Sequence, residues 1–387
     1  MSTRSMISLP CDVLMSETLP IQDLVPQLQA EFETALAVFL REHPLRSSYT
    51  NGLTQFYSEL QSFVTRRAKR IRPLLFLVSH RIFSGSSTAH SESLMRSAVA
   101  LELFHSFILI HDDIIDRSDR RRGEPTLHRL LEAALHSHKP KADRARLGVN
   151  AAIVLGDILF ALAVETLLEA GFPSERTQLA VGAFLRYVGE TGRGELLDVL
   201  HAARDVSRVS VSEIQRTYAL KTTKYTFECP LMLGAILAGA PKASLNVLIQ
   251  FTKPVGLAFQ IQNDLNEFRD ERASGKEIVE DLFEGKKTLL IRKAYDRLGK
   301  SDRLFLQTCF DATRLTEAAV NRIRELVLSS GAFVELESDV SRLFAEAIAI
   351  IKKSRLSPMQ QSEILGMMDY LKTSTLAPPT RPRGSGG

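Results

Sequence analysis

An apolar helix that ends in a cluster of carboxylates is the feature that most constrains the fold. Residues 100–110 (ALELFHSFILI) are apolar almost throughout, and a helix that is apolar for three turns is a buried one. Four acids follow it: Asp112, Asp113, Asp116 and Asp119. We expect these acids to open into a cavity, although acidic runs on solvated helix faces are also common.

The spacing of the acids suits a metal ion. Asp112 and Asp116 are four residues apart, so a helix places both carboxylates on one face, with Asp113 beside them. Closely packed carboxylates repel one another, and hard divalent cations, Mg²⁺ above all, relieve that cost. Arg121 and Arg122 follow within ten residues of Asp112. Carboxylates, metal and guanidinium groups together suit a diphosphate.

Composition narrows the class of protein. The 387 residues are 44% hydrophobic and 24% charged, which is ordinary for a globular protein. The net charge of +4 gives nucleic-acid binding no electrostatic support. Cys11, Cys229 and Cys309 lie far apart, which fits a reducing compartment and excludes a cysteine zinc site. Neither a secretory signal nor an apolar run of about 18 residues is present, so we expect a cytoplasmic protein without a transmembrane helix.

Helical periodicity runs through the chain. Apolar spacing and length predict helices over residues 22–42, 96–116, 149–171, 176–203, 210–224, 230–238, 245–269, 287–298, 314–330, 336–354 and 358–372. Alternating strand patterns are missing, so we predict an all-α fold with ten or more helices. We expect residues 1–20 and 374–387 to be disordered, residues 134–147 to form a solvated loop, and residues 21–373 to form the folded domain.

Two basic motifs carry anion-binding groups. Lys69 and Arg72 lie in KRIRP (69–73), where Pro73 is expected in the first turn of a helix, and a helix N-terminus favours anions. Lys221 stands beside the hydroxyl of Thr222 in KTTK (221–224), a pairing that can hold phosphate oxygens. Without further context, the first motif is an ordinary basic turn and the second a polar helix end.

A second set of oxygen ligands lies in FQIQNDLNE (259–267). Asn263 and Glu267 are four residues apart and Asp264 is three residues from Glu267, so a helix places them near one another. GKEIVEDLFEGKK (275–287) follows. By itself this segment is also compatible with a solvated amphipathic helix.

Taken in this order, the motifs resemble those of the trans-isoprenyl diphosphate synthases, the family of farnesyl and geranylgeranyl diphosphate synthases. They are KRIRP (69–73), ELFHSFILIHDDIIDRSDRRRGEPTLH (102–128), GD (156–157), GELLD (194–198), KTTKYTFECPLMLGA (221–235), FQIQNDLNE (259–267) and GKEIVEDLFEGKKTLL (275–290). The resemblance covers roughly residues 25–370. It implies the isoprenoid synthase fold, a barrel of antiparallel helices around a deep central cavity, and a homodimer.

The resemblance also implies roles for individual residues. The metal ligands, expected to hold three Mg²⁺ ions, match Asp112, Asp116, Asn263, Asp264 and Glu267. The pocket for isopentenyl diphosphate matches Lys69, Arg72, His105 and Arg122. The groups on the allylic diphosphate match Arg121, Lys221, Thr222, Gln260 and Lys276. Catalysis would then depend on Asp112, Asp116, Arg121, Lys221 and Lys276.

The geometry of His105 agrees with this assignment. It lies seven residues before Asp112, about two helical turns, and therefore on the same face. A histidine on an apolar helix is also commonly a core residue with a local hydrogen bond. Beside arginines and carboxylates we favour the substrate role.

The implied reaction follows from charge. Mg²⁺ and cationic side chains stabilise the departing diphosphate, so the allylic C–O bond ionises. An apolar cavity shields the carbocation from water, and isopentenyl diphosphate attacks with its double bond. No serine or cysteine nucleophile is needed. The partners are therefore isopentenyl diphosphate and allylic diphosphates.

Asn263 departs from the family pattern, which has aspartate at this position. An amide oxygen can ligate Mg²⁺, but without the negative charge. Asn263, Glu267 and Glu271 recur at a spacing of four, which is similar to the metal triad of class I terpene cyclases. A cyclase on the same fold, acting on a preformed prenyl diphosphate, is therefore an alternative. A non-catalytic partner subunit is a second alternative, which the intact Asp112 and Arg121 argue against.

Two phenylalanines upstream of the acids are candidate determinants of product length. Phe107 lies about 7.5 Å before Asp112 along the helix and Phe104 about 12 Å. In the family, an aromatic five residues before the first aspartate, with no insertion between the aspartates, is typical of enzymes that stop at C20. We therefore predict geranylgeranyl diphosphate as the product, with farnesyl diphosphate next, although both phenylalanines could be plain core residues.

Overall fold

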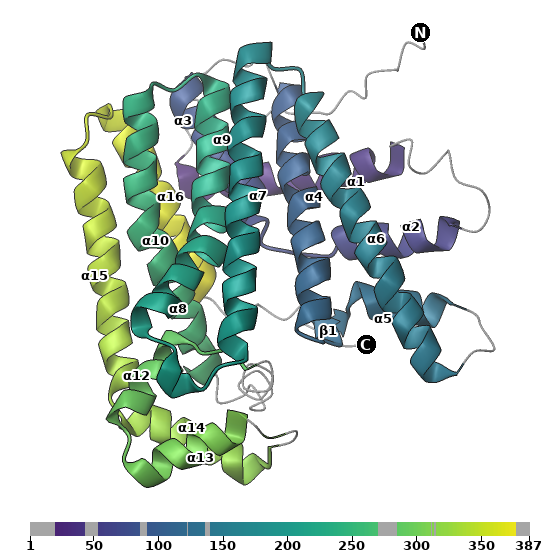
Figure 1. Ribbon diagram of the computed structural model, residues 1–387. Coiled ribbons are helices and arrows are strands. Elements are labelled where there is room, and N and C mark those ends of the chain that lie inside the picture. Colours follow the sequence, from purple (N-terminus) through teal and green to yellow (C-terminus); the bar gives the residue numbers. More distant parts are fainter. Residues whose placement is uncertain are drawn as a thin grey trace, which may run out of the picture. The chain divides into compact units, whose positions relative to one another are not determined.

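The structure is a computed structural model that describes residues 20–42, 53–85, 91–121, 123–135, 140–269, 285–310, 312 and 315–376. Helices dominate these residues (Figure 1), and the prediction of an all-α fold is confirmed. The Cα positions divide the chain into two compact units, residues 1–183 with 233–240, and residues 184–232 with 241–387. Each unit is described by itself.

The first unit is built on helices α1 to α6. Their bounds are α1 Ile21–Glu42, α2 Thr54–Val64, α3 Ile71–Ser84, α4 Ser91–Ile115, α5 Leu127–Ala134 and α6 Lys141–Leu168. Helix α4 lies beside α6 and also packs against α1 and α3 (Figure 1). Apolar residues spaced three and four apart explain this packing, because Leu28, Phe32 and Leu36 of α1 are all buried.

Two further helices link the units in sequence. Helix α7 covers Ser174–Ala202 and α9 covers Cys229–Ala238. Within the first unit, Gly234 of α9 lies so close to α3 that a Cβ would come within 2.4 Å of the Phe76 carbonyl oxygen. The absence of a side chain at Gly234 therefore permits this close helix contact.

The second unit contains the remaining helices. They are α8 Val211–Tyr218, the π-helical segment η4 Ala219–Glu228, α10 Lys242–Arg269, α12 Leu289–Arg297, α13 Lys300–Phe310, α14 Glu317–Ser329, α15 Ala332–Lys353 and α16 Pro358–Leu376, with the short turn η3 Val206–Arg208. Ser210 and Glu213 form a reciprocal capping box at the start of α8. Thr288 and Thr316 cap the starts of α12 and α14, where each side-chain oxygen accepts a hydrogen bond from a backbone N–H.

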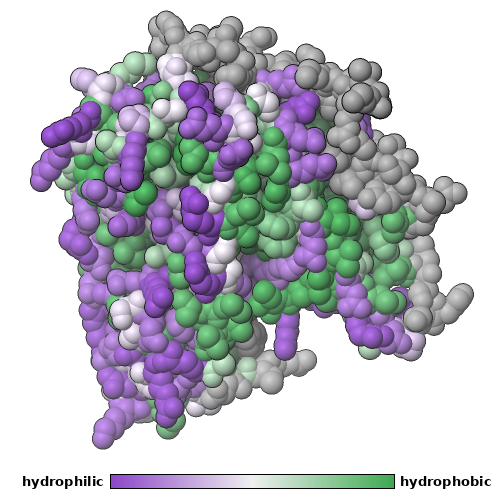
Figure 2. Space-filling model, turned by 45° about the horizontal axis from the view of Figure 1, so that its top comes forward, coloured by the Kyte–Doolittle hydropathy of each residue, from purple (hydrophilic) through white to green (hydrophobic). Residues whose placement is uncertain are grey.

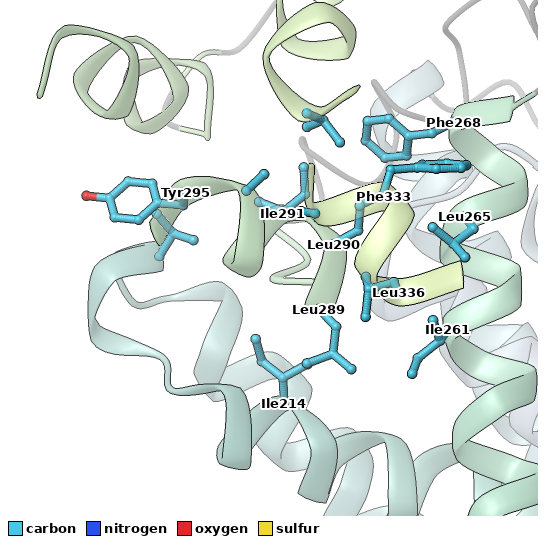
Figure 3. Close-up of a cluster of buried hydrophobic side chains, with 14 of the residues drawn as sticks. Ile214, Ile261, Leu265, Phe268, Leu289, Leu290, Ile291, Tyr295, Phe333 and Leu336 are labelled. Atoms are coloured by element: carbon cyan, nitrogen blue, oxygen red, sulfur yellow. The ribbon is translucent and has the colours of Figure 1, made fainter. Parts of the chain in front are cut away.

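A continuous apolar core holds the second unit together (Figure 3). Ile261 and Leu265 of α10 face Leu289 of α12 and Leu336 of α15 in this cluster. Burial of such side chains contributes about 25 cal/mol for each Å² of apolar surface removed from water. This core fixes α10, which carries the second acidic motif.

Several expectations about local structure are wrong. Residues 141–147 are not loop, because α6 already begins at Lys141; Pro140 precedes it and Asp143 lies in its first turn, both favourable at a helix start. Helices α2, α5 and α13 were not predicted. Two short strands, β1 Arg120–Arg121 and β2 Glu124–Pro125, pair in antiparallel fashion. Helix α16 continues through Leu376, into the segment expected to be disordered.

Two described helices, α4 and α6, are long and apolar enough to cross a membrane by length and composition alone. In α4, 67% of the apolar window is buried inside the protein, as in a core helix, whereas in α6 the share is 39%. No helix of this kind was predicted, because the sequence contains no continuous apolar run of about 18 residues. Helix α6 nevertheless reaches the required length and mean hydropathy. Ile153 and Val154 are among its exposed apolar residues.

Candidate active site

The first acidic motif lies where α4 ends. Carboxylate oxygens of Asp112 and Asp116 come within 4.8 Å of one another, as their spacing predicts, and both side chains are half-buried. The helix ends because Arg117 takes a left-handed conformation with φ of 54°. The Ser118 N–H donates to the Asp113 carbonyl at 2.9 Å, the six-to-one bond of a Schellman motif. This turn sends the chain back toward the acids.

The paired strands β1 and β2 return Arg121 to the acidic motif. Its Nε donates to Asp113 Oδ1 at 2.5 Å and its Nη2 donates to Asp112 Oδ2 at 2.9 Å. Gly123, with φ of 82°, lies between the two strands, where a left-handed residue suits a tight turn. Arg121 therefore lies against the first acidic motif, and its role on the allylic diphosphate stays a prediction. Arg122 lies outside the described residues.

Asp113 differs from Asp112 and Asp116 because it is buried. Burial raises the pKa of its carboxyl to about 6, against the opposing influence of the Arg121 guanidinium. Its Oδ2 has no hydrogen-bond partner among the described residues. Asp113 therefore anchors Arg121, while Asp112 and Asp116 offer the more accessible oxygens.

The basic turn lies against the middle of α4. Arg72 Nη1 lies 3.1 Å from His105 Nε2, so two of the predicted pocket residues are in direct contact. Lys69 lies at the exposed side of this turn, and partial desolvation lowers the pKa of its ammonium group. Arg72 and His105 therefore form one contact pair in the first unit, and Lys69 lies three residues before Arg72 in the same turn.

In the second unit, Lys221 lies between two carboxylates of α7. Its Nζ is 2.8 Å from Glu195 Oε2 and 2.9 Å from Asp198 Oδ2. Both acids belong to GELLD (194–198), whose residues were not predicted as site residues, although the spacing of three between the acids was visible. At Gly194 a Cβ would lie 2.7 Å from the Lys221 backbone nitrogen. Only glycine therefore lets α7 approach the π-helical segment this closely.

The second acidic motif is joined to Thr222 by a chain of hydrogen bonds. Thr222 Oγ1 donates to Gln260 Oε1 at 2.9 Å, and Gln260 Nε2 donates to Asp264 Oδ1 at 3.0 Å. The Tyr218 hydroxyl donates to Asp264 Oδ2 and accepts from the Leu289 N–H at 3.0 Å. Burial and the Asp264 charge raise the pKa of Tyr218, so its hydroxyl stays protonated.

Through these contacts Asp264 holds Tyr218 and Gln260 beside the second acidic motif. Asp264 is only 3% exposed and both of its oxygens accept from protein donors. Asn263 is half-buried on the same helix. The side chain of Glu267 and all of Lys276 lie outside the described residues.

The two candidate length determinants form an aromatic cluster. The rings of Phe104 and Phe107 stack with centroids 5.8 Å apart, and Phe160 of α6 lies 5.4 Å from Phe107. Phe104 is fully buried and Phe107 is half-buried. Phe160 was not predicted, since its place beside Phe107 depends on the packing of α6 on α4.

Comparison with known proteins agrees with these features. A family model described as polyprenyl synthetase matches residues 54–327. The geranylgeranyl diphosphate synthase of Sulfolobus acidocaldarius is 31% identical over 254 residues, which are 64% of this chain and 70% of that protein. The enzyme of the same name from Saccharolobus solfataricus is 29% identical over 316 residues, 81% of this chain and 87% of that protein.

A solved structure gives the same result. The geranylgeranyl pyrophosphate synthase of Corynebacterium glutamicum, complexed with isoprenyl diphosphate and magnesium, has a TM-score of 0.81 and 26% identity. The match covers 90% of this chain and 98% of that one. Fold and motifs together define an enzyme of the isoprenoid synthase fold, a trans-prenyltransferase. The chain belongs to the polyprenyl synthetase family.

Proposed function

We propose that the protein condenses isopentenyl diphosphate with allylic diphosphates and that geranylgeranyl diphosphate is its main product. The observation that carries the proposal is the pairing of Asp112 and Asp116 at the end of α4, with Arg121 held against them. This arrangement suits a diphosphate bound through a metal. The names of the two archaeal relatives support the product.

The first motif fits magnesium by the chemistry of its donors. Asp112 and Asp116 supply hard carboxylate oxygens at a separation that one cation can bridge. Asn263 and Glu267 are the candidates for the second motif, and we propose three Mg²⁺ ions in all. The bound ions would supply positive charge that neutralises the diphosphate oxygens.

The protein's own cations complete this neutralisation. Arg121 is a fixed guanidinium, since Asp113 holds its Nε, and it can fork onto diphosphate oxygens. Lys221 is held by Glu195 and Asp198, with Thr222 and Gln260 beside it. We place Lys276 in the same group. Positive charge fixed where negative charge develops favours departure of the diphosphate.

A separate pocket receives isopentenyl diphosphate. We assign it to Lys69, Arg72, His105 and Arg122, of which Arg72 and His105 are in contact. The diphosphate bound there does not leave its carbon, because isopentenyl diphosphate attacks with its double bond and its C–O bond stays intact. The two diphosphates therefore need separate sets of cations.

Phe107 and Phe104 limit the product to C20 in this proposal. Overall similarity does not set chain length, because the geranylfarnesyl diphosphate synthase of Aeropyrum pernix is 28% identical to this chain, close to the value for the Saccharolobus enzyme. The stacked rings of Phe104 and Phe107 supply bulk on the helix that carries the acids, and Phe160 of α6 packs against them. Farnesyl diphosphate is the next candidate product.

We also propose a homodimer in the cytoplasm, with residues 21–373 as the catalytic domain. Helix α7 exposes Leu185, Leu196 and Leu200, which recur at helical spacing on one stripe. Ile153 and Val154 of α6 are exposed as well. Figure 2 shows hydrophobic side chains at the surface between hydrophilic ones on the face displayed. Apolar surface of this kind supports association with a second copy.

A substitution in the first motif tests the function. Asp112→Ala should reduce the rate on the order of 10³-fold or more, because the metal site loses a ligand that acts in the transition state. Asp119→Ala is the matched control: this acid belongs to the same run, but it is exposed and pairs with Arg129. Near-normal turnover of Asp112→Ala, measured with saturating Mg²⁺, would contradict the proposal.

A further inference from the structure

Arg70 has an unusual backbone conformation at the start of α3. It precedes the helix with φ of 46° and ψ of 37°, the left-handed region that residues with a side chain rarely adopt. Such a conformation persists only where the surroundings impose it. Lys69 precedes it directly, and Arg72 follows two residues later. The conformation of Arg70 therefore sets the direction in which these two residues leave the turn.

The Arg70 side chain is fixed by three parts of the first unit. Its Nε donates to Glu33 Oε1 of α1 at 2.8 Å and its Nη1 donates to Glu102 of α4. The carbonyl oxygens of Val64 and Arg66, at the end of α2 and just beyond it, accept from the same guanidinium at 3.2 and 2.9 Å. Arg70 is 3% exposed and Glu102 is 2% exposed. Ion pairs so well shielded from water are screened little by salt.

Helix α4 thus contacts the turn at two points. Glu102 receives Arg70, and His105, three residues later and nearly one helical turn along, lies 3.1 Å from Arg72. A guanidinium with five donors in a fixed fork is suited to such multiple contacts, whereas a lysine is not. Arg70, which the protein holds, therefore lies between Lys69 and Arg72, which are assigned to substrate, in the same short turn.

We propose that Arg70 is a positioning residue for the isopentenyl diphosphate pocket. Its contacts with Glu33 and Glu102 hold the left-handed turn. The turn in this way places Arg72 against His105 and sets where Lys69 precedes the helix. This inference rests on the proposed function. In this proposal Arg70 does not touch substrate, and its effect passes through Lys69 and Arg72.

The test separates the two substrates kinetically. In Arg70→Lys and in Glu102→Gln, the KM for isopentenyl diphosphate, measured at saturating allylic substrate, should rise by about tenfold or more, because small displacements of binding groups cost heavily. The KM for the allylic substrate should stay within about twofold. Arg70→Gly, which relieves the backbone but removes the guanidinium, should raise the KM for isopentenyl diphosphate as well.

A merely stabilising role predicts a different pattern. Leu28→Ala is the control, since Leu28 is fully buried on α1, the helix that carries Glu33; it should lower Tm and leave both KM values unchanged. If the Arg70 and Glu102 variants lower Tm but leave the KM for isopentenyl diphosphate within about twofold of wild type, the inference is wrong.

Folding failure does not remove the test. Glu33→Gln removes only one of the two ion pairs of Arg70, and the Glu33 side chain is 34% exposed. We therefore expect this variant to fold and to show a smaller rise in the KM for isopentenyl diphosphate. If the other variants do not fold, an unchanged KM in Glu33→Gln overturns the inference. Failure of the proposed function is distinguishable, because wild type would then consume no isopentenyl diphosphate at all.

Discussion

At the scale of single residues, two cations of the candidate site are each held by a pair of carboxylates. Arg121 contacts Asp112 and Asp113, and Lys221 contacts Glu195 and Asp198. Arg121 was predicted to bind diphosphate from its distance to the acids, and the structure places it on Asp112 and Asp113. The anchoring of Lys221 by Glu195 and Asp198 was not predicted. Pairings between side chains of different helices depend on packing, which spacing along one helix does not contain.

Tyr218 illustrates a residue that no motif indicated. Its hydroxyl connects Asp264 of α10 to the first backbone N–H of α12. We expect Tyr218→Phe to lower the free energy of unfolding by about 1–3 kcal/mol, because a buried carboxylate and a buried N–H each lose a hydrogen bond. Denaturant titration measures this loss.

Tyr295→Phe is the matched control for Tyr218→Phe. Tyr295 is 7% exposed and belongs to the same apolar cluster (Figure 3). Within the described part of the chain, its hydroxyl lacks a pair of buried hydrogen-bond partners like that of Tyr218. Its change in unfolding free energy should be clearly smaller. Equal losses in the two variants would show that the hydroxyl of Tyr218 is not special.

At the scale of helices, long periodic segments were predicted well and short ones poorly. Helix α10 was predicted within a few residues because its apolar pattern extends over many turns. The pattern of α2 was present, since Phe56, Leu60 and Phe63 follow helical spacing, but the segment is short enough to pass for a loop. In residues 134–147 the density of charge suggested a loop, although lysine, arginine and alanine are also good helix formers.

The π-helical segment η4 lies where Lys221 meets α7, and π-helical turns often occur at functional sites. Gly194→Ala should lower both Tm and the turnover rate, since its Cβ would lie 2.7 Å from the Lys221 backbone nitrogen and 2.9 Å from Leu220 Cβ. The helix and the π-helical segment would have to move apart, and Lys221 would move with them. We expect a loss of about tenfold or more in rate.

Gly189→Ala is the control within the same helix, because its Cβ would meet nothing within 4 Å in this chain. It should keep the turnover rate and could gain stability, as alanine favours helix over glycine. If both alanine variants behave alike, the close approach at Gly194 has no consequence for catalysis.

The aromatic cluster of α4 and α6 is the proposed limit to product length. Phe107→Ala should lengthen the product beyond C20, and adding Phe104→Ala should lengthen it further, because each substitution removes a ring upstream of the acids. The double variant also loses buried surface in Phe104, for which a stability loss of about 3–5 kcal/mol is typical. Chromatography of the dephosphorylated products gives the chain lengths.

Phe76→Ala separates the two effects. Phe76 is fully buried on α3. Its replacement by alanine should lower stability without changing product length. An unchanged product distribution in the Phe104 and Phe107 double variant would rule out this cluster as the limit.

At the scale of the whole molecule, the order of the motifs was more informative than any one of them. Each basic or acidic motif alone also fits a solvated helix or turn, but their joint order predicted the family that the comparisons established. Composition and periodicity predicted the all-α class, since strands were missing from the pattern. The core of the second unit could not be predicted in detail, because Ile261, Leu289 and Leu336 come from three separate helices.

The most direct measurement is the product of the wild-type protein with labelled isopentenyl diphosphate, Mg²⁺ and dimethylallyl, geranyl or farnesyl diphosphate as primer. The account predicts that label enters an acyclic C20 diphosphate from each primer, and that chelation of Mg²⁺ abolishes incorporation. A cyclic hydrocarbon formed without isopentenyl diphosphate, no incorporation of label, or main products of C30 or longer would contradict it.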